Sequence, residues 1–221
     1  LLTRPDGVLP PRIMDVPVFK GTVVAAQGHL GAFEIVVNDY APLEVSSRAA
    51  LGFEAGRDNA SSTCDLILDL TGGSPLFPAP EKRDGYFNPD PGNPAAVQRA
   101  LFDLCGMVGE FEKPKFFQYK ANICAHGRNT QIGCNACVEV CSALAIASDI
   151  QRNQIVVNPQ LCVGCGACTT VCPTGAISFA YPRASEQGVK LRTLLATYQK
   201  AGGKDAALLL HSQQAGADLI N

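Results

Sequence analysis

The chain has 221 residues, a hydrophobic fraction of 47% and a formal net charge of −2 at pH 7. This size and apolar content allow one or two packed domains, and the weakly acidic balance provides no basic field for nucleic acid, so we expect no nucleic-acid partner. Neither an apolar run long enough to cross a bilayer nor a signal peptide is present in the sequence, so we expect no membrane span.

Residues 1–71 predict a small β-rich domain. Residues 1–17 contain four prolines and indicate an extended lead-in. Two β-branched runs, Thr22–Ala26 and Phe33–Val37, flank a glycine-containing segment and predict a hairpin. The alternating run Asp65–Leu70 predicts a half-buried strand. Cys64 lies at the start of that run, and we interpret it as a small buried apolar residue.

Residues 72–121 predict a linker and a helix. Residues 72–94 are rich in proline and glycine, but contain aromatic residues that we expect to pack onto a surface. Asn93 and Pro94 predict a helix start, and apolar spacing continues the helix to Gly109. Cys105 lies on the apolar stripe, so we interpret it as a core residue. The lysines and aromatic residues of 111–121 favour a strand with solvated lysines over a surface for single-stranded nucleic acid.

Eight of the ten cysteines lie in the stretch from Cys124 to Cys172. Its second half reads Cys162-x2-Cys165-x2-Cys168-x3-Cys172-Pro173, the spacing that binds bacterial-type [4Fe–4S] clusters. Three thiolates on a tight loop can face three corners of one cubane, because Gly164 and Gly166 let the backbone curl around it. The fourth cysteine of such a run serves a neighbouring cluster.

The first half of this stretch is an imperfect copy of the second. Residues 133–146 and 164–177 are identical at eight of 14 positions, at an offset of 31 residues. Gln131, which cannot ligate iron, stands at the position that matches Cys162. Cys124 is the nearest replacement, and we expect the intervening loop, Ala125–Gly133, to bring it back to the cluster.

On these motifs, residues 122–182 resemble a bacterial-type two-cluster ferredoxin domain within a larger multidomain iron–sulfur protein. The resemblance implies a ferredoxin-like, pseudo-symmetric fold with two [4Fe–4S] clusters and crossed ligation. It assigns cluster one to Cys124, Cys134, Cys137 and Cys172, and cluster two to Cys141, Cys162, Cys165 and Cys168. The sequence departs from this family pattern in two places. The long gap after Cys124 leaves a [3Fe–4S] centre as the alternative for cluster one. Ser142 replaces the usual proline, which loosens the local turn.

Several simpler interpretations compete with this assignment. Paired Cys-x2-Cys motifs can bind zinc, but one tetrahedral site leaves four regularly spaced cysteines without a role. A chain of this size does not need a disulfide framework for stability. Because thiolate ligands persist in a reducing compartment, we expect a cytoplasmic protein. Cys124 has a free buried thiol as its alternative. For His126 we favour hydrogen bonding over cluster ligation, and for Arg128 a surface position.

Charge within residues 122–182 is nearly balanced, with two basic and two acidic residues. A freely diffusing ferredoxin commonly steers toward its partners through a strongly charged surface. We therefore hypothesise that this segment is covered by the N-terminal domain or by a partner subunit.

Residues 183–221 predict a helix–strand–helix segment of α/β type. The helix spans residues 186–201 and stops at Gly202 and Gly203, a buried strand covers 206–210, and a second helix covers 214–220. Because a second strand does not follow and the chain opens with Leu1, we expect the start of a truncated α/β domain. The alternative is that the strand at 206–210 joins the N-terminal sheet. The whole chain is thus predicted to be α+β.

The function predicted from these motifs is electron transfer through two clusters, as a relay module of a larger oxidoreductase system. Redox proteins or further domains of the same chain are the expected partners. The alternative is an iron–sulfur oxidoreductase whose catalytic or flavin site lies in the N-terminal domain or in a missing segment. A third interpretation gives the clusters a purely structural role. No Walker loop and no dinucleotide fingerprint occurs in the sequence.

Overall fold

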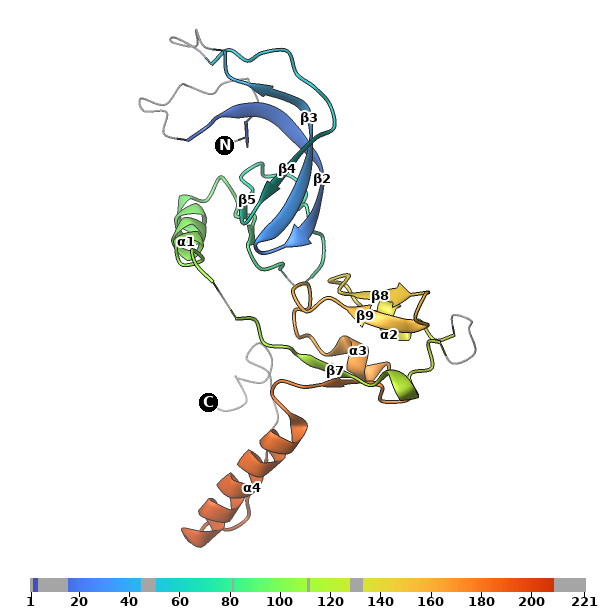
Figure 1. Cartoon of the computed structure of the whole chain (residues 1–221). Helices are drawn as coiled ribbons and strands as arrows, with labels where there is room; N and C mark the ends of the chain where they lie inside the picture. The colour runs from blue at the N-terminus through green and yellow to red at the C-terminus, as the bar shows by residue number, and fades with distance from the viewer. Residues whose placement is uncertain are drawn as a thin grey trace.

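The computed structural model describes residues 2–3, 16–44, 51–80, 82–110, 112–127 and 133–208. Figure 1 shows three parts strung out along the chain: a sheet near the N-terminus, a central region of short strands and helices, and a long helix that projects from it. The chain contains both helices and strands, and most of the strand pairs are antiparallel, which is the α+β class.

The N-terminal sheet has the order β1-β2-β3-β4, formed by β1 (Leu2–Thr3), β2 (Phe19–His29), β3 (Ala32–Pro42) and β4 (Ala60–Cys64). Strand β1 runs parallel to β2, and the other pairs are antiparallel. The predicted hairpin is confirmed, with strands longer than expected. Gly31 has a φ of 79°, so the residue at this turn adopts the left-handed conformation that glycine tolerates best.

The linker packs on this sheet through its aromatic residues, as predicted. Phe33 is fully buried in β3, and the ring of Phe77 lies 5.6 Å from it. The ring of Tyr86 in turn meets Phe77 edge-on at 5.1 Å. These contacts make the linker part of the N-terminal core, because each ring removes apolar surface from water.

The strand predicted for Asp65–Leu70 is wrong in extent. Only β5 (Ile67–Leu68) forms, in parallel pairing with β6 (Tyr86–Phe87) from the linker. The carboxylate of the buried Asp69 accepts hydrogen bonds from neighbouring side chains instead of continuing an alternating pattern. Strand β4 escaped prediction because its sequence, ASSTC, is polar and three of its residues are exposed.

Helix α1 (Pro94–Cys105) begins as predicted, with the Asn93 side chain accepting a hydrogen bond from Ala96 N at 3.2 Å. It ends at Cys105 and not at Gly109. The predicted burial of its apolar stripe is wrong: Ala100 alone is buried, Phe102 is 80% exposed, and Cys105 is exposed and not a core residue. Apolar spacing specified the helix, but it does not specify what the stripe faces.

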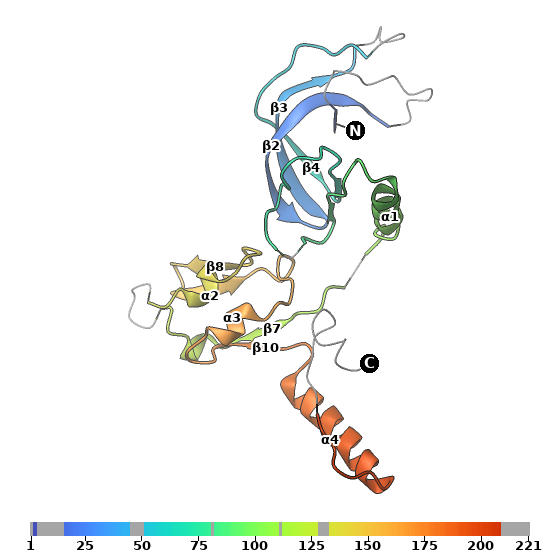
Figure 2. The same cartoon turned by 180° about the vertical axis from the view of Figure 1, so that it is seen from behind.

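The central region is built from short elements. Strand β7 (Phe117–Tyr119) pairs antiparallel with β10 (Ile177–Phe179), and β8 (Ile146–Asp149) forms a hairpin with β9 (Gln154–Val157). A 3-10 turn spans Ala121–Ile123. The strand predicted within residues 111–121 is confirmed as β7. Figure 2 shows β7 beside β10, with helix α3 near them and α2 near β8.

Two one-turn helices follow the sequence repeat. Helix α2 (Ala136–Glu139) and helix α3 (Ala167–Thr170) begin and end 31 residues apart, at the offset of the repeat. Each begins one residue before a cysteine, Cys137 in α2 and Cys168 in α3. The core beside them consists of five buried side chains: Phe117, Cys137, Ile146, Ile155 and Ile177.

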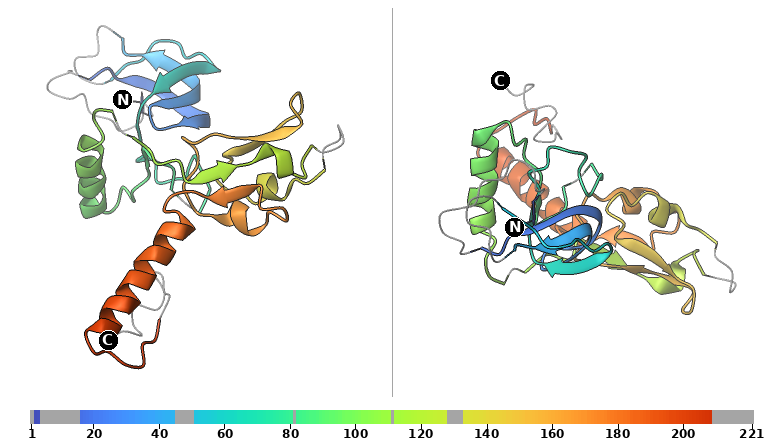
Figure 3. Two further views of the ribbon diagram at one scale, coloured as in Figure 1. Left: turned by 60° about the horizontal axis from the view of Figure 1, so that its bottom comes forward. Right: turned by 90° about the horizontal axis from the view of Figure 1, so that it is seen from above.

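Helix α4 (Ala184–Lys200) confirms the helix predicted after the central region, and none of its residues is buried. Figure 3 shows it projecting away from the other elements. Residues 206–208 are not in a strand, and the remainder of the predicted strand and the helix at 214–220 lie outside the described residues. Within the described residues, every helix is too short or too polar to cross a membrane. The division of the chain into four domains stays a prediction.

Candidate metal centres

The loop that carries the second cysteine motif is shaped by two glycines. Gly164 has a φ of 72° and Gly166 a φ of 78°, the left-handed region expected for a backbone curled around a cluster. A Cβ on Gly164 would meet the ring of Phe116 at 2.8 Å, so the loop also lies close against an aromatic side chain. Cys165, between the glycines, is exposed.

Cys168 lies among the cysteines that the resemblance assigns to cluster two. Burial raises the pKa of its thiol to about 11, and repulsion from Cys162, Cys165 and Cys141 adds to the rise. A weaker contribution comes from Cys137 of the other set, so the two sets are neighbours. Neighbouring thiolates destabilise one another unless a cation or a metal cluster compensates their charge.

Cys137 lies in the same way among the cysteines assigned to cluster one. Burial raises the pKa of its thiol, and repulsion from Cys124, Cys134 and Cys172 raises it further. Cys137 and Cys168 thus each interact with the other three cysteines of the set that the resemblance assigns to them. In these assigned sets, Cys141 and Cys172 are each exchanged between the two halves of the repeat.

Backbone and hydroxyl donors surround the two exchanged cysteines. Ala145 N donates to Cys141 Sγ at 3.3 Å, and Thr174 Oγ1 lies 3.7 Å from Cys172 Sγ. Burial alone would raise the pKa of the Cys172 thiol, but hydrogen bonds from Ile177, Thr174 and Ala176 outweigh it and lower the pKa. Such donors stabilise thiolate sulfur, and hydrogen bonds to sulfur are one determinant of a cluster's potential.

The segment after Cys124 is held against the rest of the region by a buried histidine. His126 is 2% exposed, with Nδ1 lying 2.9 Å from Cys134 O and Nε2 lying 2.7 Å from Ser148 Oγ. A carbonyl oxygen can only accept, so Nδ1 carries the proton, and in the neutral ring Nε2 accepts from the serine hydroxyl. The predicted hydrogen-bonding role of His126 is confirmed, whereas Arg128 and Gln131 lie outside the described residues.

Backbone hydrogen bonds close the base of this long loop. Gly133 N donates to His126 O at 2.7 Å, and Cys134 N donates to Ala125 O at 3.3 Å. A Cβ on Gly133 would meet Ala125 O at 2.6 Å, so glycine permits the close approach. These bonds place Cys124 near Cys134 although nine residues separate them in the sequence.

Tyr119 is a neighbour of the site that sequence reasoning missed. Burial raises the pKa of its hydroxyl to about 12, and a hydrogen bond to Cys124 contributes to the rise. Ile155 N donates to the same hydroxyl oxygen at 3.4 Å. The available signal was an aromatic residue at a half-buried position of a strand that ends five residues before Cys124.

The two remaining cysteines stand apart from these sets. Cys64 is half-buried in the N-terminal sheet, and burial raises the pKa of its thiol. Cys105 is exposed on α1. In the described part of the chain, no three Cys, His, Asp or Glu side chains come close enough together to hold a single metal ion.

Arg83 connects the N-terminal sheet to the segment that follows Cys141. Its Nη1 donates to Gly28 O at 2.8 Å, and its Nη2 lies 3.4 Å from Ala143 O. Its guanidinium also lies 4.2 Å from the centre of the Phe77 ring. Lys113 makes a second connection of this kind, between the linker and the cysteine-bearing region. Its Nζ donates to Asp84 Oδ2 at 2.9 Å and to Gln160 O at 2.8 Å.

Comparison with known families agrees with the class of site that this geometry defines. A family model described as a 4Fe-4S dicluster domain matches residues 132–176. The chain therefore contains a 4Fe–4S ferredoxin-type domain, and the chemistry it indicates is iron–sulfur electron transfer. Cys124 lies outside the matched residues. No curated protein matches the chain.

Proposed function

We propose that the chain is an electron relay with two [4Fe–4S] clusters, working as a module of a larger oxidoreductase system. Cluster one takes Cys124, Cys134, Cys137 and Cys172, and cluster two takes Cys141, Cys162, Cys165 and Cys168. The observation that carries this proposal is the tertiary grouping around the buried Cys137 and the half-buried Cys168. Cys137 has three of these cysteines as neighbours and Cys168 has the other three.

The clusters, when bound, each accept and release single electrons. The protein's own residues hold the thiolates in place, exclude water and donate hydrogen bonds to sulfur. The donors near Cys141 and Cys172 belong to this work, and so do the aliphatic core residues Ile146 and Ile177. Fixed donors stabilise the added negative charge without rearrangement, which favours rapid electron exchange.

Cys124 completes cluster one in this proposal, and a [3Fe–4S] centre is the alternative if it does not. The support for Cys124 is local: its hydrogen bond with Tyr119, its closeness to Cys137 and the ties of His126 across the loop base. Each of these ties would be expected of a ligand that replaces a missing cysteine at another position in the sequence.

Partners and location follow from the same chemistry. A relay needs a donor and an acceptor, so we infer contact with redox proteins or with further domains of the same chain. All ten cysteines are free of disulfides, and ligand thiolates persist best in a reducing compartment, so we propose the cytoplasm.

The test is a count of iron and sulfide on anaerobically prepared protein, with electron paramagnetic resonance before and after reduction. About eight iron and eight sulfide per chain, with signals from two reduced cubanes, are expected. A Cys168→Ala variant should lose cluster two, whereas Cys105→Ser, a matched change outside both sets, should lose nothing. Colourless, iron-free protein would refute the proposal, and a flavin band beside the cluster absorbance would favour a catalytic role.

Cys124→Ala tests separately the one proposed ligand that lies outside the residues matched by the family model. The expected result is conversion of cluster one to a three-iron centre, seen as a new signal in the oxidised protein while cluster two is unchanged. Cys64→Ala is the control. If the Cys124→Ala protein retains two intact cubanes, Cys124 is not a ligand, although the relay itself survives.

A further inference from the structure

An aromatic layer leads from the exposed cysteine of cluster two to the protein surface. The ring of Phe116 lies against Gly164, and the ring of Phe179 lies 3.8 Å from the Cβ position of Gly166, on either side of Cys165. The rings of Phe116 and Phe179 are stacked, with their centres 6.4 Å apart. The ring of Tyr181 lies at the same distance from Phe116 and is the outermost of the three.

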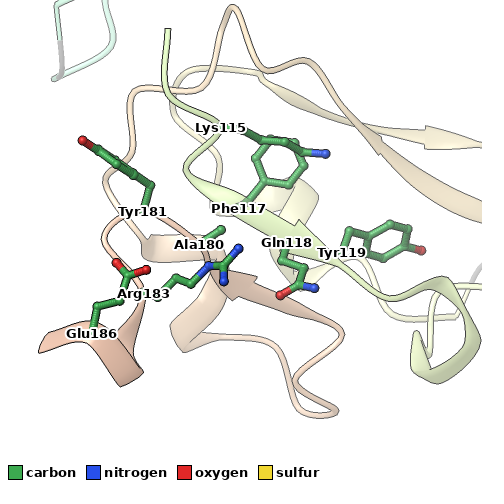
Figure 4. A pocket seen from close by; sticks show the side chains of 8 residues that line it. All are labelled: Lys115, Phe117, Gln118, Tyr119, Ala180, Tyr181, Arg183 and Glu186. Carbon is green, nitrogen blue, oxygen red and sulfur yellow. The ribbon is translucent and has the colours of Figure 1, made fainter. Parts of the chain in front are cut away.

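This layer is unusually accessible for aromatic side chains. Phe179 is 37% exposed and Tyr181 is 56% exposed. Beside Tyr181 an open cavity of about 630 Å³ lies between the start of β7 and the connection from β10 to α4. Figure 4 shows Lys115 and Gln118 on the β7 side of this cavity, and Tyr181 and Arg183 on the other side.

Positive charge gathers at the cavity although the whole chain carries a net charge of −2. Lys115 and Arg183 line it, with Glu186 as the single acidic residue of the lining. Residues 183–204 contain five lysines and arginines against one glutamate. Among the described residues, neither Lys115 nor Arg183 is in an ion pair with a carboxylate.

The balanced charge of residues 122–182 did not reveal this positively charged face, because the cations of the face lie just outside that segment. Lys115 precedes it, and Arg183 follows it directly. They come together because β7 and β10, from opposite ends of the segment, pair side by side. Exposed aromatic residues with arginine beside them are the composition enriched in protein–protein interfaces.

We propose that the surface formed by the Cys165 loop, Phe179, Tyr181, Lys115 and Arg183 docks an acidic redox protein that exchanges electrons with cluster two. Carboxylates of that protein pair with Lys115 and Arg183, while the aromatic layer forms the dry centre of the contact. The exposed Cys165 then lies at the interface, close to the partner's own cofactor. The inference rests on the proposed function and adds to it the docking face and the charge of the partner.

The experiment measures electron transfer from the reduced full chain, with both clusters loaded, to an oxidised acidic flavodoxin as the probe. Stopped-flow rates are recorded from low to high ionic strength. For the parent chain the rate should fall steeply as salt is added, because opposite charges steer the encounter. In a Lys115→Glu, Arg183→Glu variant the low-salt rate should fall by about tenfold and the salt dependence should flatten or invert.

Two further variants make the test specific. Arg152→Glu is the control, because it reverses an exposed charge in the β8–β9 turn. The electron-transfer rate of this variant should stay within about twofold of the parent's rate. Tyr181→Ala should slow transfer while leaving the salt dependence intact, since it removes contact area and no charge. Iron content and resonance spectra are checked for every variant.

The outcomes separate the inference from the proposed function. If the clusters are present but the transfer rate falls equally in the Arg152 variant and the Lys115/Arg183 variant, or falls in neither, the docking face alone is overturned. Protection of residues 179–186 from hydrogen exchange in the unpartnered full chain would also overturn it, whether a second copy or another segment covers the face. Absence of clusters would instead refute the relay.

Discussion

The N-terminal sheet and the cysteine-bearing region differ in what fills their interiors. The sheet packs ordinary apolar side chains, with Phe33 and Ala41 fully buried and Val37 2% exposed. In the other region the buried core includes Cys137, and four further cysteines lie half-buried against it: Cys141, Cys162, Cys168 and Cys172. The first interior is an ordinary hydrophobic core, whereas the second combines apolar side chains with cysteine thiols.

This difference predicts two sources of stability in one chain. Burial of apolar area stabilises the sheet by roughly 25 cal/mol per Å². Clustered thiols gain little in that way. Burial, together with repulsion between the thiolates, raises the pKa values of Cys137 and Cys168, so ionising these thiols is unfavourable without a compensating charge. The cysteine region should therefore depend on its metal for folding, as metal-binding domains with small cores commonly do.

Cluster removal should have the largest effect and should separate the two regions. Chelation of iron from oxidised protein is expected to abolish hydrogen-exchange protection in the β8–β9 hairpin, because metal binding supplies the folding free energy there. Protection of β2 and β3 should persist. Peptide-resolved exchange by mass spectrometry measures both, and simultaneous loss in the two regions would show that they share one folding unit.

Phe33→Ala should produce the opposite pattern. Removing a fully buried ring from the sheet is expected to cost about 3–5 kcal/mol in the free energy of unfolding of the sheet. Iron content should stay at the parent level. Val24→Ala, at a position 53% exposed in the neighbouring strand, is the control and should change stability by less than about 0.5 kcal/mol. Loss of iron in the Phe33 variant would contradict independent stabilisation.

Asp69 should make the stability of the sheet region dependent on pH. Burial alone would raise the pKa of this carboxyl, but hydrogen bonds from Thr71, Asn88 and Tyr86 outweigh it and lower the pKa. The stabilisation is thus complete above the unfolded-state pKa of about 3.9 and is lost as the pH falls through the lower folded-state pKa.

Asp69→Asn should remove this acid sensitivity and cost about 2 kcal/mol at neutral pH. The cost arises because Tyr86 Oη and Asn88 Nδ2 both donate to Oδ2, and an amide nitrogen at that position cannot accept. Denaturant midpoints between pH 3 and 7 measure both effects, with Asp65→Asn as a nearby control. If the loss of stability at low pH is unchanged in the Asp69 variant, that loss arises from other carboxylates.

Arg83→Gln should have the smallest effect on stability and the most direct effect on the connection between the regions. Losing the bonds to Gly28 O and Ala143 O is expected to cost about 1 kcal/mol and to widen the gap between the unfolding midpoints of the two regions. Arg57→Gln is the matched control, since Arg57 lies over the Tyr40 ring within the sheet. Equal shifts in both variants would mean that Arg83 does not couple the regions.

The sequence by itself determined the features whose cause is local. Cysteine spacing, the repeat at an offset of 31 residues, and the glycines at 164 and 166 already predicted the curled loops that the structure has. Asn93 and Pro94 likewise predicted the start of α1, because a cap and a fixed φ act within one turn. Short-range chemistry of this kind needs no knowledge of distant residues.

Only the tertiary structure decided the features that depend on a distant partner. The apolar spacing of α1 specified a helix, but not that Phe102 would remain exposed. The ties of His126 to Cys134 O and Ser148, and of Arg83 to Ala143 O, join residues far apart in the sequence. Local patterns set the shape of a segment, whereas its neighbours are set by the packing of the whole chain, because burial and hydrogen bonding are satisfied between segments.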